Sequence, residues 1–258
     1  MITRDTLLAL LRRALHEDEA VDAAWEGGSA AFARDDLLSD IDAVAVVADD
    51  AVEAVFARVE QALATLSPIE LQLTMPPQPG YAQRFYRLRD AGEFLVIDFV
   101  LFRRSDPLLF REVELHGRGT TWFDRSGVLV ERHLDGAADL EAATARVPVL
   151  AAQFEMFQHL VLKEIARGHG SDALAFYQAW TLRPLVEALR LLHAPHTRIF
   201  GLRYLARDLP AAVVARVESL AFVGSLQQLP AAHEQARAWG RECLRRLQAL
   251  GPGAGIGG

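Results

Sequence analysis

Cysteine, lysine and long apolar runs are scarce in this sequence, and each shortage excludes something. The 258 residues contain one cysteine, Cys243, so the chain can form no internal disulfide and a cysteine-based metal site is not expected. No apolar run approaches ~18 residues, so no transmembrane helix is predicted. The formal net charge is −7, which disfavours long-range attraction to nucleic acid and to anionic membranes.

The remaining composition favours a soluble, cytoplasmic protein. Hydrophobic residues make up 51 % of the chain, enough for the core of one large domain or of two modest ones. The first twenty residues carry Arg and Asp within their apolar stripe and no small-residue cleavage site follows, so they predict an amphipathic helix and not a signal peptide. We therefore expect neither a nucleic-acid nor a membrane partner, and the sequence leaves the oligomeric state open.

Residues 1–140 predict an α+β domain with a small mixed sheet. Thr3 can cap a first helix, in which Leu7, Leu11 and Leu15 recur at helical spacing. Apolar runs and alternating patterns predict strands at 21–27, 40–47, 69–75, 82–90 and 93–102, with a helix at 49–67. The last two strands flank a short Gly-containing turn, which is typical of a β-hairpin.

Residues 141–250 predict an all-α helical bundle of about five helices. Apolar residues at helical spacing end at Gly168, and Pro184 should kink or interrupt the next long helix. The Gly-rich tail, residues 251–258, cannot bury much surface and is expected to be disordered.

An Asp-x-Asp pair, Asp40 and Asp42, introduces the apolar run at 43–47. The chain has 17 aspartates, so about one such pair is expected by chance and the pair alone carries little information. On a strand, however, the two carboxylates project from one face while Ile41 points to the other. Adjacent carboxylates repel each other unless a cation lies between them, and Mg²⁺ typically binds one or two carboxylates together with substrate phosphates.

A small-residue turn precedes this pair. Gly27, Gly28 and Ser29 offer backbone N–H groups and a hydroxyl in a turn that only small residues permit, and such turns bind anions. A glycine-serine turn alone is most often only a turn. Followed by an Asp-x-Asp strand, it is more specific for a phosphate and metal site.

The stretch "GGSAAFARDDLLSDID", residues 27–42, resembles the signature of the nucleotidyltransferase fold: a Gly-Ser turn, a spacer of about ten residues, then Ser-Asp-x-Asp. Aminoglycoside nucleotidyltransferases, small MNT-type proteins and the wider polymerase-beta-like superfamily share it. The resemblance implies an N-terminal nucleotidyltransferase fold followed, as in aminoglycoside-type enzymes, by a helical domain. It also implies a third carboxylate from a later strand, and Asp98 in "FLVIDFVLF" fits, because a charge among apolar residues is costly unless it is paired or metal-bound.

The resemblance further implies Mg²⁺-dependent attack of an acceptor hydroxyl on the α-phosphate of ATP or another nucleoside triphosphate, with two metal ions and release of pyrophosphate. The acceptor would be a small molecule, as aminoglycosides are for the relatives, and AMP the group transferred. Asp98 could take the acceptor's proton; Glu70 is a weaker candidate. The implied residues are Asp40, Asp42 and Asp98 for catalysis and metal binding, and Gly27, Gly28, Ser29, Arg34, Ser39 and Lys163 for nucleotide binding.

Two alternatives stay open. One is an MNT-type transferase or antitoxin that modifies a partner protein, although MNT proteins are usually one small domain. The other is a nucleotide-binding module with weak or no turnover. Ala33 favours this second alternative, because it adds a Cβ where relatives often need the conformational freedom of glycine. Lys163, the one lysine among 27 strong bases, is equally compatible with a solvated helix residue.

Overall fold

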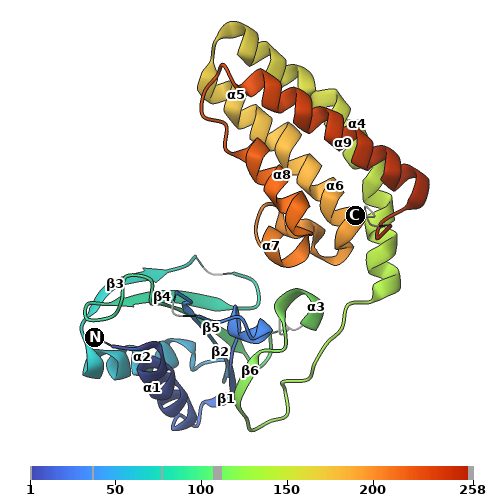
Figure 1. Cartoon of the computed structure of the whole chain (residues 1–258). Helices are drawn as coiled ribbons and strands as arrows, with labels where there is room; N and C mark the ends of the chain where they lie inside the picture. The colour runs from blue at the N-terminus through green and yellow to red at the C-terminus, as the bar shows by residue number, and fades with distance from the viewer. Residues whose placement is uncertain (1, 37, 77, 107–111, 255–258) are drawn as a thin grey trace. The chain divides into compact units, whose positions relative to one another are not determined.

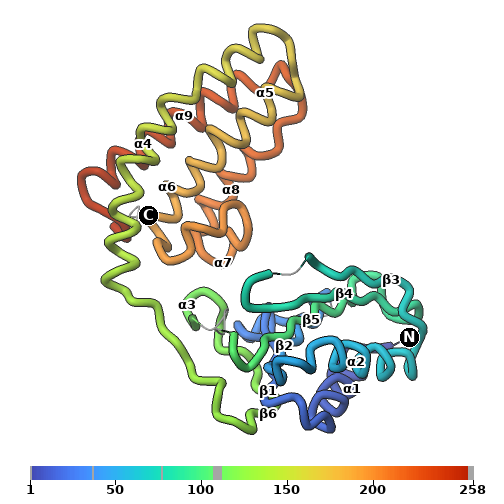
Figure 2. The backbone as a smooth tube through the Cα atoms, turned by 180° about the vertical axis from the view of Figure 1, so that it is seen from behind, coloured from blue at the N-terminus to red at the C-terminus, as the bar shows by residue number. Residues whose placement is uncertain are grey.

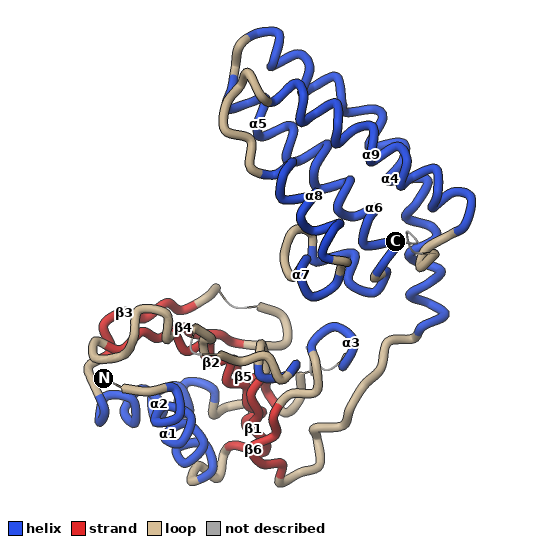
Figure 3. The backbone as a smooth tube through the Cα atoms, viewed as in Figure 1, coloured by secondary structure: helices blue, strands red, loops and turns tan. Residues whose placement is uncertain are grey.

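The computed structural model describes residues 2–36, 38–76, 78–106 and 112–254. The chain divides into two compact units, Met1–Leu134 and Asp135–Gly258. The first unit contains the strands and the second is built from helices (Figure 3). This is the α+β arrangement followed by a helical region that the sequence predicts.

One six-stranded mixed sheet organises the first unit, in the order β3-β4-β5-β2-β1-β6. Strands β2 and β5 are parallel, and every other neighbouring pair is antiparallel. The predicted hairpin is formed by β4 and β5. The strands are β1 (Val21–Glu26), β2 (Ile41–Val47), β3 (Ile69–Thr74), β4 (Ala82–Leu88), β5 (Val96–Arg103) and β6 (Thr120–Asp124).

Helices α1 (Arg4–His16) and α2 (Val52–Leu66) lie side by side against one face of this sheet (Figures 1 and 2). Thr3 caps α1 as predicted, because its side chain accepts a hydrogen bond from the Thr6 amide. Phe56 of α2 meets Phe99 of β5 edge to face, with ring centroids 5.5 Å apart. These contacts belong to the larger apolar core of the unit.

The other face of the sheet positions the acidic residues. A smaller apolar cluster lies there, in which Trp25 of β1 stacks on Phe102 of β5. Because side chains alternate between the faces of a strand, Asp42 shares this face with Val44, and Asp98 shares it with Phe102. The two aspartates therefore lie opposite α1 and α2.

Three short elements of the first unit are not predicted from the sequence. They are the 3-10 segment Ala30–Phe32, helix α3 (Val113–His116) and strand β6. None is long enough to show a periodicity, and β6 is defined by its pairing with β1, which sequence patterns do not report.

The second unit begins at Asp135, whose side chain accepts hydrogen bonds from the Ala137 and Ala138 amides and caps α4. The expected boundary at residues 140 and 141 therefore lies inside α4, which also contains Pro148. The helices are α4 (Gly136–Arg167), α5 (Gly170–Tyr177), a π-helical segment (Gln178–Leu182), α6 (Arg183–His193), a 3-10 segment (Pro195–Phe200), α7 (Leu205–Asp208), α8 (Ala211–Ala221) and α9 (Leu229–Leu250).

The predicted interruption near Pro184 is confirmed, because the π-helical segment separates α5 from α6 immediately before this proline. The predicted disordered tail lies partly outside the described residues, which end at residue 254. Within them, the Gly253 amide donates to the Leu191 carbonyl at 2.7 Å. Among the described helices, none combines the length and apolarity needed to cross a membrane.

A buried arginine organises one corner of the helical unit. Arg190 of α6 is 0 % exposed. Its guanidinium donates to the Gly201 carbonyl at 2.8 Å, to the Thr197 hydroxyl at 2.7 Å and to the Asp208 carboxylate at 2.5 Å. The charge is paired and every partner belongs to the segment after α6, so this arginine fixes the conformation of that segment.

Candidate functional site

Asp42 and Asp98 lie side by side in the sheet of the first unit. They are register partners on the parallel strands β2 and β5, so their side chains project from the same face at the same level. Both are half-buried. Asp40 immediately precedes β2 and is exposed.

The environment of these carboxylates disfavours their ionised forms. Burial raises the pKa of Asp42 to about 7, the negative charges of Asp40, Asp98 and Glu26 add to the effect, and the positive charge of Arg4 acts against it. Burial also raises the pKa of Asp98, while a hydrogen bond from Gln83 acts in the opposite direction. The site therefore holds more negative charge than it can accommodate alone, which favours binding of a cation.

Other buried acids of this unit are neutralised by arginine. Asp22 forms a two-pronged ion pair with Arg104 at 2.6 and 2.7 Å, and Glu26 pairs with Arg4. Within the described residues, neither Asp42 nor Asp98 forms such a pair. This contrast separates the two strand aspartates from the structural ion pairs around them.

Asp40, the third predicted ligand, does not form one tight group with Asp42 and Asp98 in the described structure. Among the described residues, the carboxylate oxygens of Asp40, Asp42 and Asp98 do not all lie within 4.8 Å of one another. Asp40 precedes the strand, where no sheet neighbour sets its side chain, and Arg4 Nε lies 3.4 Å from its carbonyl oxygen. Its repulsion from Asp42 is consistent with this separation.

The glycine turn packs directly on Asp42. The Gly27 amide donates to the Asp42 carbonyl at 2.8 Å. Gly28 has a φ of +54°, and a Cβ on it would lie 1.6 Å from Asp42 Oδ2. Only glycine can occupy this position without displacing the carboxylate, so the turn and the aspartate form one site.

Ser29 follows with an unsatisfied hydroxyl. Its Oγ is buried and has no hydrogen-bond partner in the described part of the chain. The Gly28 and Ser29 amides likewise donate no hydrogen bond to the described residues, whereas that of Gly27 is already used. A buried hydroxyl beside two available amides is typical of an anion site.

A short 3-10 helix, Ala30–Phe32, follows Ser29 and leads to Ala33, the position at which the family signature often has glycine. Ala33 has φ 52° and ψ 45°, the left-handed conformation that favours glycine. The backbone therefore adopts the conformation suited to glycine although alanine occupies the position. Arg34 is exposed, and its amide donates to the Ser29 carbonyl at 3.1 Å. The Ser39 hydroxyl accepts from the Asp36 amide at 2.9 Å, so its structural contacts are within the loop.

Two residues near the carboxylates are missed by sequence reasoning. Gln83 of β4 donates from Nε2 to Asp98 Oδ1 at 2.7 Å. Arg4 of α1 pairs with Glu26 and lies near the backbone of Asp40. Alternation along β4 could show which residues share a face with Gln83, but only the strand register shows that this face meets Asp98. Glu70, the weaker candidate base, pairs with Arg87 at 3.1 Å.

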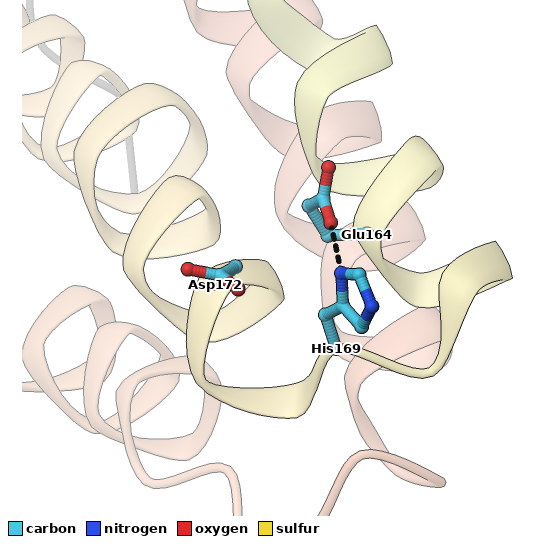
Figure 4. A group of neighbouring side chains, drawn as sticks. All are labelled: Glu164, His169 and Asp172. Atoms are coloured by element: carbon cyan, nitrogen blue, oxygen red, sulfur yellow. Dashed lines mark hydrogen bonds and ion pairs between the residues drawn. The ribbon is translucent and has the colours of Figure 1, made fainter.

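The second unit carries a separate group of ligand-type side chains at the turn from α4 to α5. Glu164, His169 and Asp172 place one ligand atom each within 4.8 Å (Figure 4). Glu164 already pairs with Arg167 at 2.6 Å and with His169 Nδ1 at 2.8 Å. These bonds tie the end of α4 to the start of α5, a structural role that needs no ion.

Lys163 is exposed on α4 beside this group. It belongs to the second unit, and its contact with a nucleotide stays a prediction.

A hollow of about 350 Å³ in the first unit lies near the opposite end of β2. Neither Asp42 nor Asp98 lines it. Some of its charged groups already have partners: Arg84 donates to Glu53 at 2.6 Å, and Asp49 accepts from a backbone amide. Gln83 also lines it and donates a hydrogen bond to Asp98, so the hollow adjoins the aspartate face without including the two aspartates.

Comparisons with known proteins do not assign a family. No protein-family model matches the chain, and no curated protein matches it. Among solved structures, a "putative nucleotidyltransferase from H. pylori" aligns with a TM-score of 0.30 and 10 % identity over 95 % of each chain. The STING-associated CdnE c-di-GMP synthase from Capnocytophaga granulosa aligns with a TM-score of 0.32 and 11 % identity, over 96 % of this chain and 81 % of that one. Similarities this low assign neither a family nor an activity to the chain.

Proposed function

We propose that this protein is a Mg²⁺-dependent nucleotidyltransferase that moves a nucleotide, AMP from ATP in the first instance, onto a hydroxyl of a small acceptor. One observation carries the proposal. Asp42 and Asp98 lie side by side without a cationic partner in the described structure, and the Gly28–Ser29 turn packs directly against Asp42. Unneutralised carboxylates beside an anion-binding turn are what a metal–triphosphate site requires.

The donor set fits a hard divalent cation. Asp42 and Asp98 would hold Mg²⁺, and Asp40, exposed at the start of the strand, would complete the ligands. Carboxylate oxygens are the ligands that Mg²⁺ prefers. Because the negative charge of Asp42 is unfavourable where it is buried, a bound cation would stabilise the ionised carboxylate. When bound, the metal would stabilise the charge that develops on the transferred phosphoryl group.

The chain's own residues would bind and orient the triphosphate. The free amides of Gly28 and Ser29, together with the buried Ser29 hydroxyl, would receive phosphate oxygens. Arg34 would add positive charge from the exposed side of the turn. Asp98 would be the candidate to accept the proton of the attacking hydroxyl, since it lies beside Asp42 in the site.

Turnover of the full-length protein tests the proposal. We expect pyrophosphate release with Mg²⁺, ATP and members of a hydroxylated acceptor panel, aminoglycosides among them, and loss of release in Asp42→Asn. Asp172→Asn is the matched control, because Asp172 belongs to the other group that could hold a metal. Wild-type turnover by Asp42→Asn would overturn the metal role.

The same experiment separates the alternatives. A rise in melting temperature with MgATP but no product from any acceptor would favour a nucleotide-binding module. Transfer of label to a protein and to no small molecule would favour a protein-directed transferase.

A further inference from the structure

We propose that Gln83 is a positioning residue for the metal site: its amide fixes one oxygen of Asp98 and leaves the negative charge of that carboxylate available to a divalent cation. This inference rests on the proposed function. It concerns the choice of a neutral donor, whereas the buried acids Asp22 and Glu26 of the same unit are paired with arginine.

The geometry follows from the register of β4 and β5. Phe85 pairs with Asp98, and Gln83 pairs with Val100, so Gln83 and Asp98 are diagonal neighbours on one face of the sheet. Gln83 Nε2 lies 2.7 Å from Asp98 Oδ1 in a partly buried setting. Asp98 thus has Gln83 on its β4 side and Asp42 on its β2 side.

A hydrogen bond to a carboxylate is charge-assisted, so it is strong enough to hold the Asp98 side chain in one orientation. It engages only Oδ1, and Oδ2 accepts no hydrogen bond from the described residues. The carboxylate is therefore oriented before any ion arrives. Such supporting bonds typically change metal affinity by about 10–100-fold when they are removed.

The amide of Gln83 is also uncharged. Arginine neutralises the buried acids Asp22 and Glu26 in the same unit. A cationic side chain at position 83 would pair with Asp98 in the same way and would compete with a metal ion for its charge. Glutamine supplies the same donor without consuming that charge.

Mn²⁺ binding to the metal-free, full-length protein tests this inference, followed by electron paramagnetic resonance without nucleotide. We expect Gln83→Leu to bind Mn²⁺ about 10–100-fold more weakly than the wild type. Gln83→Lys should lose at least as much affinity, while its melting temperature without metal stays at or above the wild-type value because the lysine pairs with Asp98. Gln72→Leu is the matched control, since Gln72 also donates to a carboxylate, Glu60, from the other face of the sheet.

The outcomes separate this inference from the proposed function. Wild-type Mn²⁺ affinity in Gln83→Leu, alongside loss of binding in Asp42→Asn, would overturn the role of Gln83 and leave the metal site intact. If Gln83→Leu does not fold, wild-type affinity in Gln83→Lys would overturn it equally. No Mn²⁺ binding by the wild type, or unchanged binding in Asp42→Asn, would instead contradict the proposed function itself.

Discussion

Replacing Asp42 with asparagine should stabilise the metal-free protein at alkaline pH while it removes metal binding. The side chain keeps its size, but the charge that burial and the neighbouring Asp40 and Asp98 disfavour is gone. A residue kept only for packing would lose stability on substitution. A gain in stability with a loss of binding is the expected sign of a site built to hold a cation.

The magnitude follows from linkage. The pKa of Asp42 is raised from 3.8 to about 7, so the folded state binds this proton more tightly than the unfolded state does. The stability that the protonated group contributes is complete below the unfolded pKa and is lost as pH rises toward 7. Full ionisation of Asp42 lowers the free energy of unfolding by at most about 4 kcal/mol. About 2–3 kcal/mol of this decrease falls between pH ~5 and pH ~8.

Urea denaturation with a chelator at both pH values measures this difference. The free energy of unfolding of Asp42→Asn, relative to the wild type, should increase by about 2–3 kcal/mol from pH ~5 to pH ~8. Added Mn²⁺ should stabilise the wild type and not the variant. Asp172→Asn should keep the wild-type pH dependence. A difference between wild type and Asp42→Asn that is the same at both pH values would refute the reasoning.

Four further substitutions, one of them a control, test the turn and the helical unit. Gly28→Ala should lose at least about 2 kcal/mol of stability and weaken Mn²⁺ binding, because its Cβ would collide with Asp42 Oδ2. Denaturation measures the first effect and Mn²⁺ titration the second. Ala33→Gly should gain about 0.5–1 kcal/mol of stability, because glycine adopts the left-handed backbone without strain. Ala30→Gly, in the adjacent right-handed turn, is the control and should lose a similar amount of stability. Equal effects of the two substitutions would contradict the inference that Ala33 is strained. Arg190→Met should cost about 3 kcal/mol, because buried partners of the guanidinium are left unpaired, and an unchanged denaturation midpoint would exclude that role.

Much of the fold was predictable because it follows from local patterns. The apolar run after Asp42 predicts β2, and the alternation of "IELQLTM" predicts β3. Pro184 marks an interruption that the π-helical segment confirms. The predicted boundary at residues 140 and 141 falls inside α4, whose N-terminal cap is Asp135.

The candidate site was predictable only in part. The spacing of Gly28, Ser29 and Asp42 along the chain carries the pattern that predicts them, whereas Asp98 was predicted from the family resemblance and from its apolar neighbours. The sequence also marks Ala33 as the position where glycine is missing, and the left-handed backbone there confirms why glycine would suit it.

By itself, then, the sequence determined which residues alternate to one face of each strand and where a small-residue turn must form, since both depend on neighbours along the chain. The tertiary structure alone decided which strands pair and in what register. That register places Asp98 beside Asp42 and brings Gln83 to Asp98. It also decided which acids meet an arginine, because pairing and burial depend on segments that are distant in the chain and meet only when the sheet has formed.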